Sequence, residues 1–108
     1  MANNNQIVKH TLYIGLNDKE TKTQKIDTVE AYKIAENILL NVCGGATIYN
    51  AMGIYRHESG ETVIENSLRV EIWGCADDQV IKAAMLLKAA LNQESIGYQT
   101  ETVISKFI

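Results

Sequence analysis

The sequence predicts an α+β domain whose elements follow the order β-α-β-β-α-β, and three observations lead to this prediction. Apolar residues recur at helical spacing in two segments, 27–43 and 77–91. Two long runs of β-type residues lie within segment 46–73 and meet around a Ser-Gly pair. Shorter β-type runs lie at 11–16 and 98–108. With 108 residues and 46% hydrophobic content, the chain is expected to form one domain around one core.

The first strand and the first helix have clear signals. In segment 11–16, three large apolar residues alternate with Thr, Tyr and Gly, as in a strand with one buried face. The polar segment 17–25 predicts a loop. Asp27 stands three residues before Glu30, which is typical of a helix start, and Gly44-Gly45 should end the helix. The apolar stripe of this helix comprises Ala31, Ile34, Ala35, Ile38 and Val42.

The two runs within segment 46–73 predict a β-hairpin that turns at 58–61. One parity is mainly apolar and should face the core; it holds Ile48, Asn50, Met52, Ile54, Ile64, Asn66, Leu68, Val70 and Ile72. The opposite face should display Tyr13, Tyr49, Tyr55, Arg69 and Trp73, with Arg56 and His57 at the turn. Soluble monomers rarely leave such rings uncovered, so a ligand, a twin subunit or both should cover this face.

The second helix and the last strand complete the order. Ala76-Asp77-Asp78 supplies the cap, and Asn92 stands near the helix end. The stripe comprises Val80, Ala84, Leu87 and Leu91. The segment 98–108 is rich in Thr, Val and Ile and predicts a strand.

This order is that of a ferredoxin-like sandwich, a four-stranded antiparallel sheet with two helices on one face. Right-handed crossovers place both helices on the same side. We expect one ligand-binding domain over residues 1–108, with residues 1–8 flexible. Because the other sheet face stays open, we also expect a homo-oligomer, at least a dimer.

Composition narrows the function classes. Ten basic and thirteen acidic residues give a net charge of -3, which disfavours a DNA- or RNA-polymer binder. Cys43 and Cys75 form no C-x-x-C pair and fit a reduced compartment. The polar start has no leader-like apolar stretch, and no run is long enough for a membrane span. The sequence therefore predicts a soluble cytoplasmic protein without a membrane partner.

Catalytic and metal motifs are nearly absent. His10, placed before the first strand, and His57, at the end of the second, show no metal-ligand spacing, so neither a metal nor another cofactor is expected. Glu65 and His57 lie on paired strands and could act as an acid-base pair. A solvated charge pair at the hairpin explains the same residues more simply, so the sequence predicts no enzyme.

Several residues are candidates for binding a nucleotide. Arg56 follows an aromatic residue at a strand end, where a guanidinium can stack and hold a phosphate; its alternative is an exposed surface Arg. Tyr55 and Trp73 offer π-faces for a base. Asn92 could read an adenine edge, although a helix C-cap is favoured on local grounds. Segment 15–19 lacks the glycine density of a phosphate cradle and suits an ordered turn.

The chain resembles the viral Thoeris anti-defence sponge family, type one, over nearly its whole length. The residues that carry the resemblance are Tyr13-Ile14-Gly15-Leu16-Asn17-Asp18-Lys19, Gln24, Gly45-Ala46-Thr47, Gly53-Ile54-Tyr55-Arg56-His57, Gly60 and Glu65. The resemblance implies a phage protein without enzymatic activity that sequesters cyclic ADP-ribose isomers made by TIR-domain enzymes and so blocks Thoeris defence. It also implies assembly from dimers with pockets at subunit junctions and, in some members, cyclic oligonucleotide binding at a separate site.

The residues expected to bind the ligand are Tyr55, Arg56, His57, Glu65, Trp73 and Asn92. Of these, Arg56 matches a motif position suited to phosphate, whereas Trp73 and Asn92 are chosen on chemistry and position. The resemblance also raises a C-terminal Arg contact with the ligand, which is in doubt here because Lys106 is the only basic residue near Ile108. The alternative is a structural or regulatory ferredoxin-like homo-oligomer without a nucleotide ligand.

Overall fold

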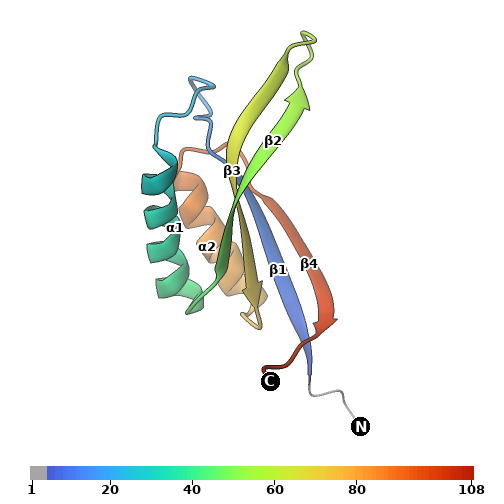
Figure 1. Ribbon diagram of the computed structural model, residues 1–108. Helices are drawn as coiled ribbons and strands as arrows, with labels where there is room; N and C mark the ends of the chain where they lie inside the picture. The colour runs from blue at the N-terminus through green and yellow to red at the C-terminus, as the bar shows by residue number, and fades with distance from the viewer. Residues whose placement is uncertain (1–4) are drawn as a thin grey trace.

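A computed structural model describes residues 5–108 and confirms the predicted fold (Figure 1). The elements are β1 (Gln6–Gly15), α1 (Thr28–Cys43), β2 (Thr47–Arg56), β3 (Thr62–Trp73), α2 (Asp77–Ala90) and β4 (Gly97–Ile104). The four strands form one sheet in the order β2-β3-β1-β4, and every neighbouring pair is antiparallel. Both helices cover the same face, as the right-handed crossover rule requires (Figure 1).

The core lies between this helix layer and the sheet. Alternate residues of β1 and β3 turn toward the helices, and the small residues Ala31, Ala35 and Ala83 let the helices approach closely. The larger apolar residues that are fully or almost fully buried are Leu12, Ile14, Leu39, Leu68, Val70, Ile72, Val80 and Leu87 within the elements, with Leu16 directly after β1 and Leu91 directly after α2. Asp27 caps α1 through its side chain, whereas Ala76 at the start of α2 makes no such bond and Asp77 lies inside the first turn.

The ends of two strands differ from the prediction. β1 begins at Gln6, so residues 6–8, expected to be flexible, pair with the far end of β4. The same expectation covered residues 1–4, which lie outside the residues that the structure describes. His10 is a fully buried member of β1 rather than a residue preceding it. β4 ends at Ile104, because Gln6, the first residue of β1, is its last partner.

The hairpin breaks the expected burial pattern. Met52, Ile54 and Ile64 lie on the predicted core parity, yet their side chains are 63%, 69% and 61% exposed. The outer half of the β2–β3 hairpin projects past the helix layer, so no element covers this stretch (Figure 1). We call this part, residues 52–64, the overhang. Within residues 5–108, no helix is long and apolar enough to cross a membrane.

Candidate functional site

A hollow of about 290 Å³ lies where the base of the overhang meets the loop after β1. We call it the Glu65 cleft, after the carboxylate that projects from β3 into it. Four chain segments meet there: the end of β1 with its loop, the two strands of the hairpin, and the turn between α2 and β4. Its lining residues are Gly15, Asn17, Asp18, Lys19, Lys22, Tyr55, His57, Val63, Glu65, Gln93, Glu94 and Ser95.

Glu65 is held against the end of β1 and the loop that follows it. The backbone N–H of Asn17 donates a hydrogen bond to Glu65 Oε2 over 2.8 Å. A Cβ atom at Gly15 would lie only 2.6–2.7 Å from the carboxylate atoms of Glu65. Glycine at position 15 therefore leaves the space that this carboxylate occupies.

The loop after β1 is tied to the end of α2. Asn92 Nδ2 donates to Asp18 Oδ1 over 2.7 Å, and Gln93 Nε2 donates to the carbonyl of Asn17 over 2.9 Å. The Asp18 carboxylate also accepts the backbone N–H groups of Glu20 and Thr21. The hydrogen bond from Asn92, followed by these backbone donors, lowers the pKa of Asp18 against the opposing effect of burial. The loop is thus an ordered turn, as its Asn and Asp suggested.

Three of the six predicted site residues line this cleft. Tyr55 and Glu65 project from the open face of the hairpin, and His57 follows at the turn with its ring 6.1 Å from that of Tyr55. Tyr55 is 49% exposed, so its ring is available to a ligand. No hydrogen bond joins His57 to Glu65 among the contacts of residues 5–108.

The other three predicted residues do not line it. Arg56 has the parity of Ile54, so it projects from the opposite face of β2, and its Nη1 donates to the Gly60 carbonyl over 3.3 Å. Asn92 commits both amide hydrogens to carboxylates, those of Asp18 and Glu20.

Trp73 stands at the far end of the sheet. It is ten residues along β3 from Val63, the partner of Tyr55, which places it about 33 Å away. There it lines a separate hollow of about 380 Å³ and meets Phe107 at a ring distance of 6.1 Å. The rings of Tyr55 and Trp73 therefore cannot contact one small ligand within a single subunit.

The charges of the cleft are mixed. Carboxylates come from Asp18, Glu65 and Glu94, whereas the ammonium groups come from Lys19 and Lys22. Such a site suits a small ligand that carries both a cationic and an anionic group, more than one carrying only a pyrophosphate. Among the described residues, no group of three or more His, Cys, Asp or Glu is placed to hold a metal ion.

Sequence reasoning did not select Asn17, Lys22, Gln93, Glu94 or Ser95 as site residues. They enter the cleft because the α2–β4 turn lies beside the loop after β1, a contact between segments more than 70 residues apart. In the sequence, the loop after β1 and the turn after α2 can be recognised only as polar segments. Their composition does not indicate that the two segments lie side by side.

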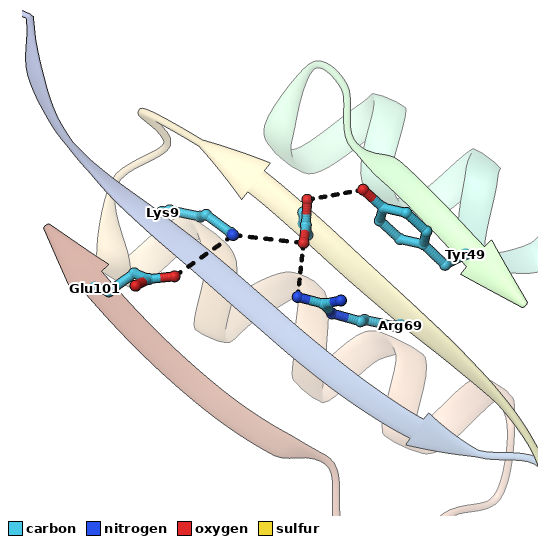
Figure 2. A network of polar contacts seen from close by, with 5 residues as sticks. Lys9, Tyr49, Arg69 and Glu101 are labelled. Carbon is cyan, nitrogen blue, oxygen red and sulfur yellow. Dashed lines mark hydrogen bonds and ion pairs between the residues drawn. The ribbon is translucent and has the colours of Figure 1, made fainter. Parts of the chain in front are cut away.

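The centre of the open sheet face holds a polar network (Figure 2). Glu71 accepts from Arg69 Nη2 at 2.8 Å and from the Tyr49 hydroxyl at 3.1 Å, and its carboxylate lies 3.5 Å from Lys9 Nζ. The Arg69 guanidinium also stands over the Tyr13 and Tyr49 rings, 6.0 and 5.4 Å from their centroids. The predicted placement of these aromatic and charged residues on the open face is therefore confirmed.

No protein-family model matches this chain, and no curated protein matches it in sequence. Solved structures share its fold. A phage SAM lyase in complex with S-methyl-5'-thioadenosine matches with a TM-score of 0.61 and 19% identity, over 94% of this chain and 92% of that one. CutA from Synechococcus elongatus matches with a TM-score of 0.59 and 12% identity, over 95% and 81% of the two chains.

The complex of B. subtilis GlnK with ATP matches with a TM-score of 0.59 and 16% identity, over 94% of this chain and 85% of that one. Two of these three neighbours were thus solved with an adenine-containing ligand. At identities this low, the likeness establishes the shared fold alone. The ligand of this chain has to be inferred from its own residues. The chain has the ferredoxin-like fold that the phage SAM lyase, CutA and GlnK share.

Proposed function

We propose that the Glu65 cleft binds S-adenosylmethionine or a close relative, and that the chain cleaves this ligand as a lyase. The observation that carries the proposal is a carboxylate, fixed by the Asn17 N–H, in the same cleft as the exposed ring of Tyr55. The fold shared with a phage SAM lyase supports the same ligand class.

Each part of this ligand has a complementary group in the cleft. The ring of Tyr55, next to that of His57, offers a surface on which an adenine base can stack. The carboxylate of Glu65 attracts the cationic groups of the ligand, its sulfonium or ammonium. Lys19 and Lys22 at the rim can meet the carboxylate of its amino-acid part.

Cleavage of this ligand needs no side-chain nucleophile. The carboxylate oxygen of the ligand can attack its own γ-carbon, and the carbon–sulfur bond then breaks with both electrons going to sulfur. The products are a lactone and neutral S-methyl-5'-thioadenosine, so charge and atoms balance without an added proton or oxidant. A site that folds the ligand into this geometry gains the proximity effect alone. The sequence predicted no enzyme because it shows no catalytic motif, and this reaction requires none.

Capture of a cyclic ADP-ribose isomer without catalysis is the second candidate. Three of the segments that carry the sponge resemblance, 13–19, 53–57 and Glu65, converge on the cleft, which favours a ligand site at these residues. Lys19 and Lys22 could meet a phosphate. The position of Arg56 on the opposite face and the three carboxylates of the cleft argue for the first candidate.

We propose that either activity takes place in a homo-oligomer. Tyr13, Tyr49, Tyr55 and Trp73 are each 43–49% exposed on the open face, and a second copy can cover such rings. The alternative of an oligomer without a nucleotide ligand uses the same surface but leaves the cleft without a role.

The two candidates are separated by mass spectrometry. The protein is incubated with S-adenosylmethionine and the unheated mixture is compared with one that lacks the protein; separately, the protein is incubated with a cyclic ADP-ribose isomer, washed, and heated to release any bound nucleotide. We expect S-methyl-5'-thioadenosine from the first mixture and no stoichiometric retention of the second nucleotide. Intact cyclic ADP-ribose released from a washed complex would support capture instead. A protein that neither consumes nor retains either compound would be the structural oligomer, and both proposals would be wrong.

Glu65→Gln and Glu101→Gln form a matched pair for this experiment. Both remove one carboxylate from the open sheet face, but Glu101 lies on β4 and pairs with Lys9 away from the cleft. The first variant should lose turnover, and the second should keep it. Equal turnover by both variants would remove Glu65 from the site.

A further inference from the structure

The loop after β1 and the end of α2 share an unusual backbone feature. Lys22 and Asn92 have φ values of 61° and 50°, and they are the only non-glycine residues between 5 and 108 with positive φ. The two residues lie far apart in the sequence, but both are hydrogen-bonded to Asp18, which lines the Glu65 cleft. Residues other than glycine adopt such angles infrequently. Asn does so more readily than most, often just after a helix, whereas a Lys at such an angle depends on the contacts around it.

Contacts from both sides enforce these angles. The Lys22 N–H donates to the Asp18 carbonyl over 2.8 Å, and the Asp18 N–H donates to the Thr23 carbonyl over 2.8 Å. At the other end, the Lys19 N–H donates to the Asn92 carbonyl over 3.1 Å, while the Asn92 amide holds Asp18. Asp18 is only 7% exposed, so its carboxylate depends on these donors rather than on water.

The base of the loop has a second anchor on β3. Asn66 Nδ2 donates to Gln24 Oε1 over 2.8 Å, and Gln24 Nε2 donates in turn to the Ile26 carbonyl. This anchor fixes where the loop rejoins the fold. The Leu16 N–H also donates to the Asn66 carbonyl over 3.0 Å, and Asn17 forms an isolated β-bridge with Gln24, so β3 and the end of the loop hold its first residues as well. Asn92 and Gln93 hold Asp18 and Asn17 from the side of α2.

We propose that Asn92 is a positioning residue of the Glu65 cleft: through Asp18 it holds the loop so that the Asn17 N–H orients the Glu65 carboxylate. The inference rests on the proposed ligand site at Glu65 and assigns Asn92 no contact with the base. Its amide is already used by Asp18 and Glu20. The chain of contacts runs from Asn92 to Asp18, along the loop to Asn17, and from there to Glu65.

Asn92→Gly separates this role from that of a helix C-cap. Glycine adopts the φ of 50° without strain, so a residue needed only as a cap should tolerate the change or gain stability. A positioning amide is lost in the same variant. Asn92→Asp keeps the size but places a carboxylate against those of Asp18 and Glu20, and should be at least as damaging.

The first readout needs no ligand. In the wild-type background, Glu65→Gln should shift the Asn17 amide proton in ¹H–¹⁵N spectra, because this N–H donates to the Glu65 carboxylate; we call this shift the response. In the Asn92→Gly background we expect a much smaller response to the same substitution, while circular dichroism shows that the fold is retained. A full response in Asn92→Gly would overturn the inference, whether or not the cleft binds anything.

The second readout uses S-adenosylmethionine itself. We expect Asn92→Gly to bind it about tenfold more weakly, the effect of losing one hydrogen bond to a charged group. Asn41→Ala, on the exposed side of α1, serves as the control and should leave binding unchanged. If wild type binds no S-adenosylmethionine, the proposed function fails, and the amide experiment still decides the role of Asn92. If wild type and Asn92→Gly bind it equally, the inference is wrong while the proposed function stands.

Discussion

Gly15→Ala tests the cleft through the smallest possible change. The new methyl group would lie 2.6–2.7 Å from the Glu65 carboxylate, whereas unstrained carbon–oxygen contacts begin at about 3.3 Å. The carboxylate must therefore retreat by roughly 0.7 Å, and it can do so because it is the end of a flexible side chain. Its 2.8 Å bond from the Asn17 N–H then lengthens toward 3.5 Å, where little hydrogen bonding is left.

The fold should survive this change and the ligand should not bind well. Position 15 has no positive φ, so alanine fits its backbone, and the displaced carboxylate can be hydrated at the cleft. We expect a loss of about 1 kcal/mol in unfolding free energy, and about 1.5–3 kcal/mol in binding of S-adenosylmethionine. Urea titration followed by circular dichroism measures the first quantity, and calorimetric titration measures the second.

Gly53→Ala is the matched control on the neighbouring strand. A Cβ there would meet Ser67 Oγ at 3.4 Å, an ordinary contact, so this variant should bind as wild type does. Equal binding by Gly15→Ala and Gly53→Ala would show that the orientation of Glu65 does not matter. A Gly15→Ala protein that fails to fold would show that the carboxylate cannot retreat, contrary to the reasoning above.

Three further predictions concern buried and titrating groups. His10→Leu should lower the unfolding free energy by about 2–4 kcal/mol in urea titration, because the Tyr98 hydroxyl and the Cys75 carbonyl lose the ring nitrogens that lie 2.9 and 2.8 Å from them. Tyr98→Phe removes only one of these contacts and should cost about 1 kcal/mol, so equal losses in the two variants would refute this ranking. The pKa of Asp18 is lowered from 3.8, so its contribution to loop order is complete above that pH and is lost as the pH falls through the folded-state value; proteolysis of the loop should rise there in wild type, and an Asp18→Asn protein that shows the same rise would contradict the assignment. Burial, followed by the neighbouring Cys75, raises the pKa of the Cys43 thiol to about 12, so Cys43 should alkylate far more slowly than a free cysteine at pH 8, and a rapid reaction would exclude this environment.

The order of elements could be predicted because each carries its own local signal. Asp27 and Gly44 marked the two ends of α1, and the structure shows Asp27 as the N-cap and Gly44 at a φ of 81°. The alternation in β3 gave the correct buried face at Leu68, Val70 and Ile72. These signals depend only on a residue and its near neighbours in the sequence.

Burial depended on what lies beyond the element and was harder to predict. Ile54 and Ile64 follow the same alternation as Val70, yet no helix reaches them. Alternation predicts which face of the sheet a residue occupies. Whether that face is buried depends on how far the helix layer extends over it. The start of β1 was missed for a related reason, since Gln6 and Lys9 are polar and are held by pairing with β4.

The candidate site was partly predictable. Tyr55, His57 and Glu65 belong to one hairpin, so their proximity follows from strand pairing. Trp73 was grouped with Tyr55 because both point to the same face, but parity does not report distance along a strand. The long-range partner of Asp18 is Asn92, which lies in the turn between α2 and β4, and only the tertiary arrangement brings the two residues together.

The overhang gives the cleft a mechanical property of its own. Tyr55 and Val63 are paired residues of β2 and β3 with no packed layer beneath them, and His57 follows β2 directly, so backbone pairing of the two strands is what holds these side chains in place. Strand pairs with few buried contacts open locally at a lower free energy than the core, and their amide hydrogens exchange sooner. A ligand bound between Tyr55 and Glu65 would therefore contact both strands and stabilise their pairing at the outer end of the hairpin. Occupancy of the cleft and order of the hairpin tip become two measures of one equilibrium, coupled without any movement of the helices.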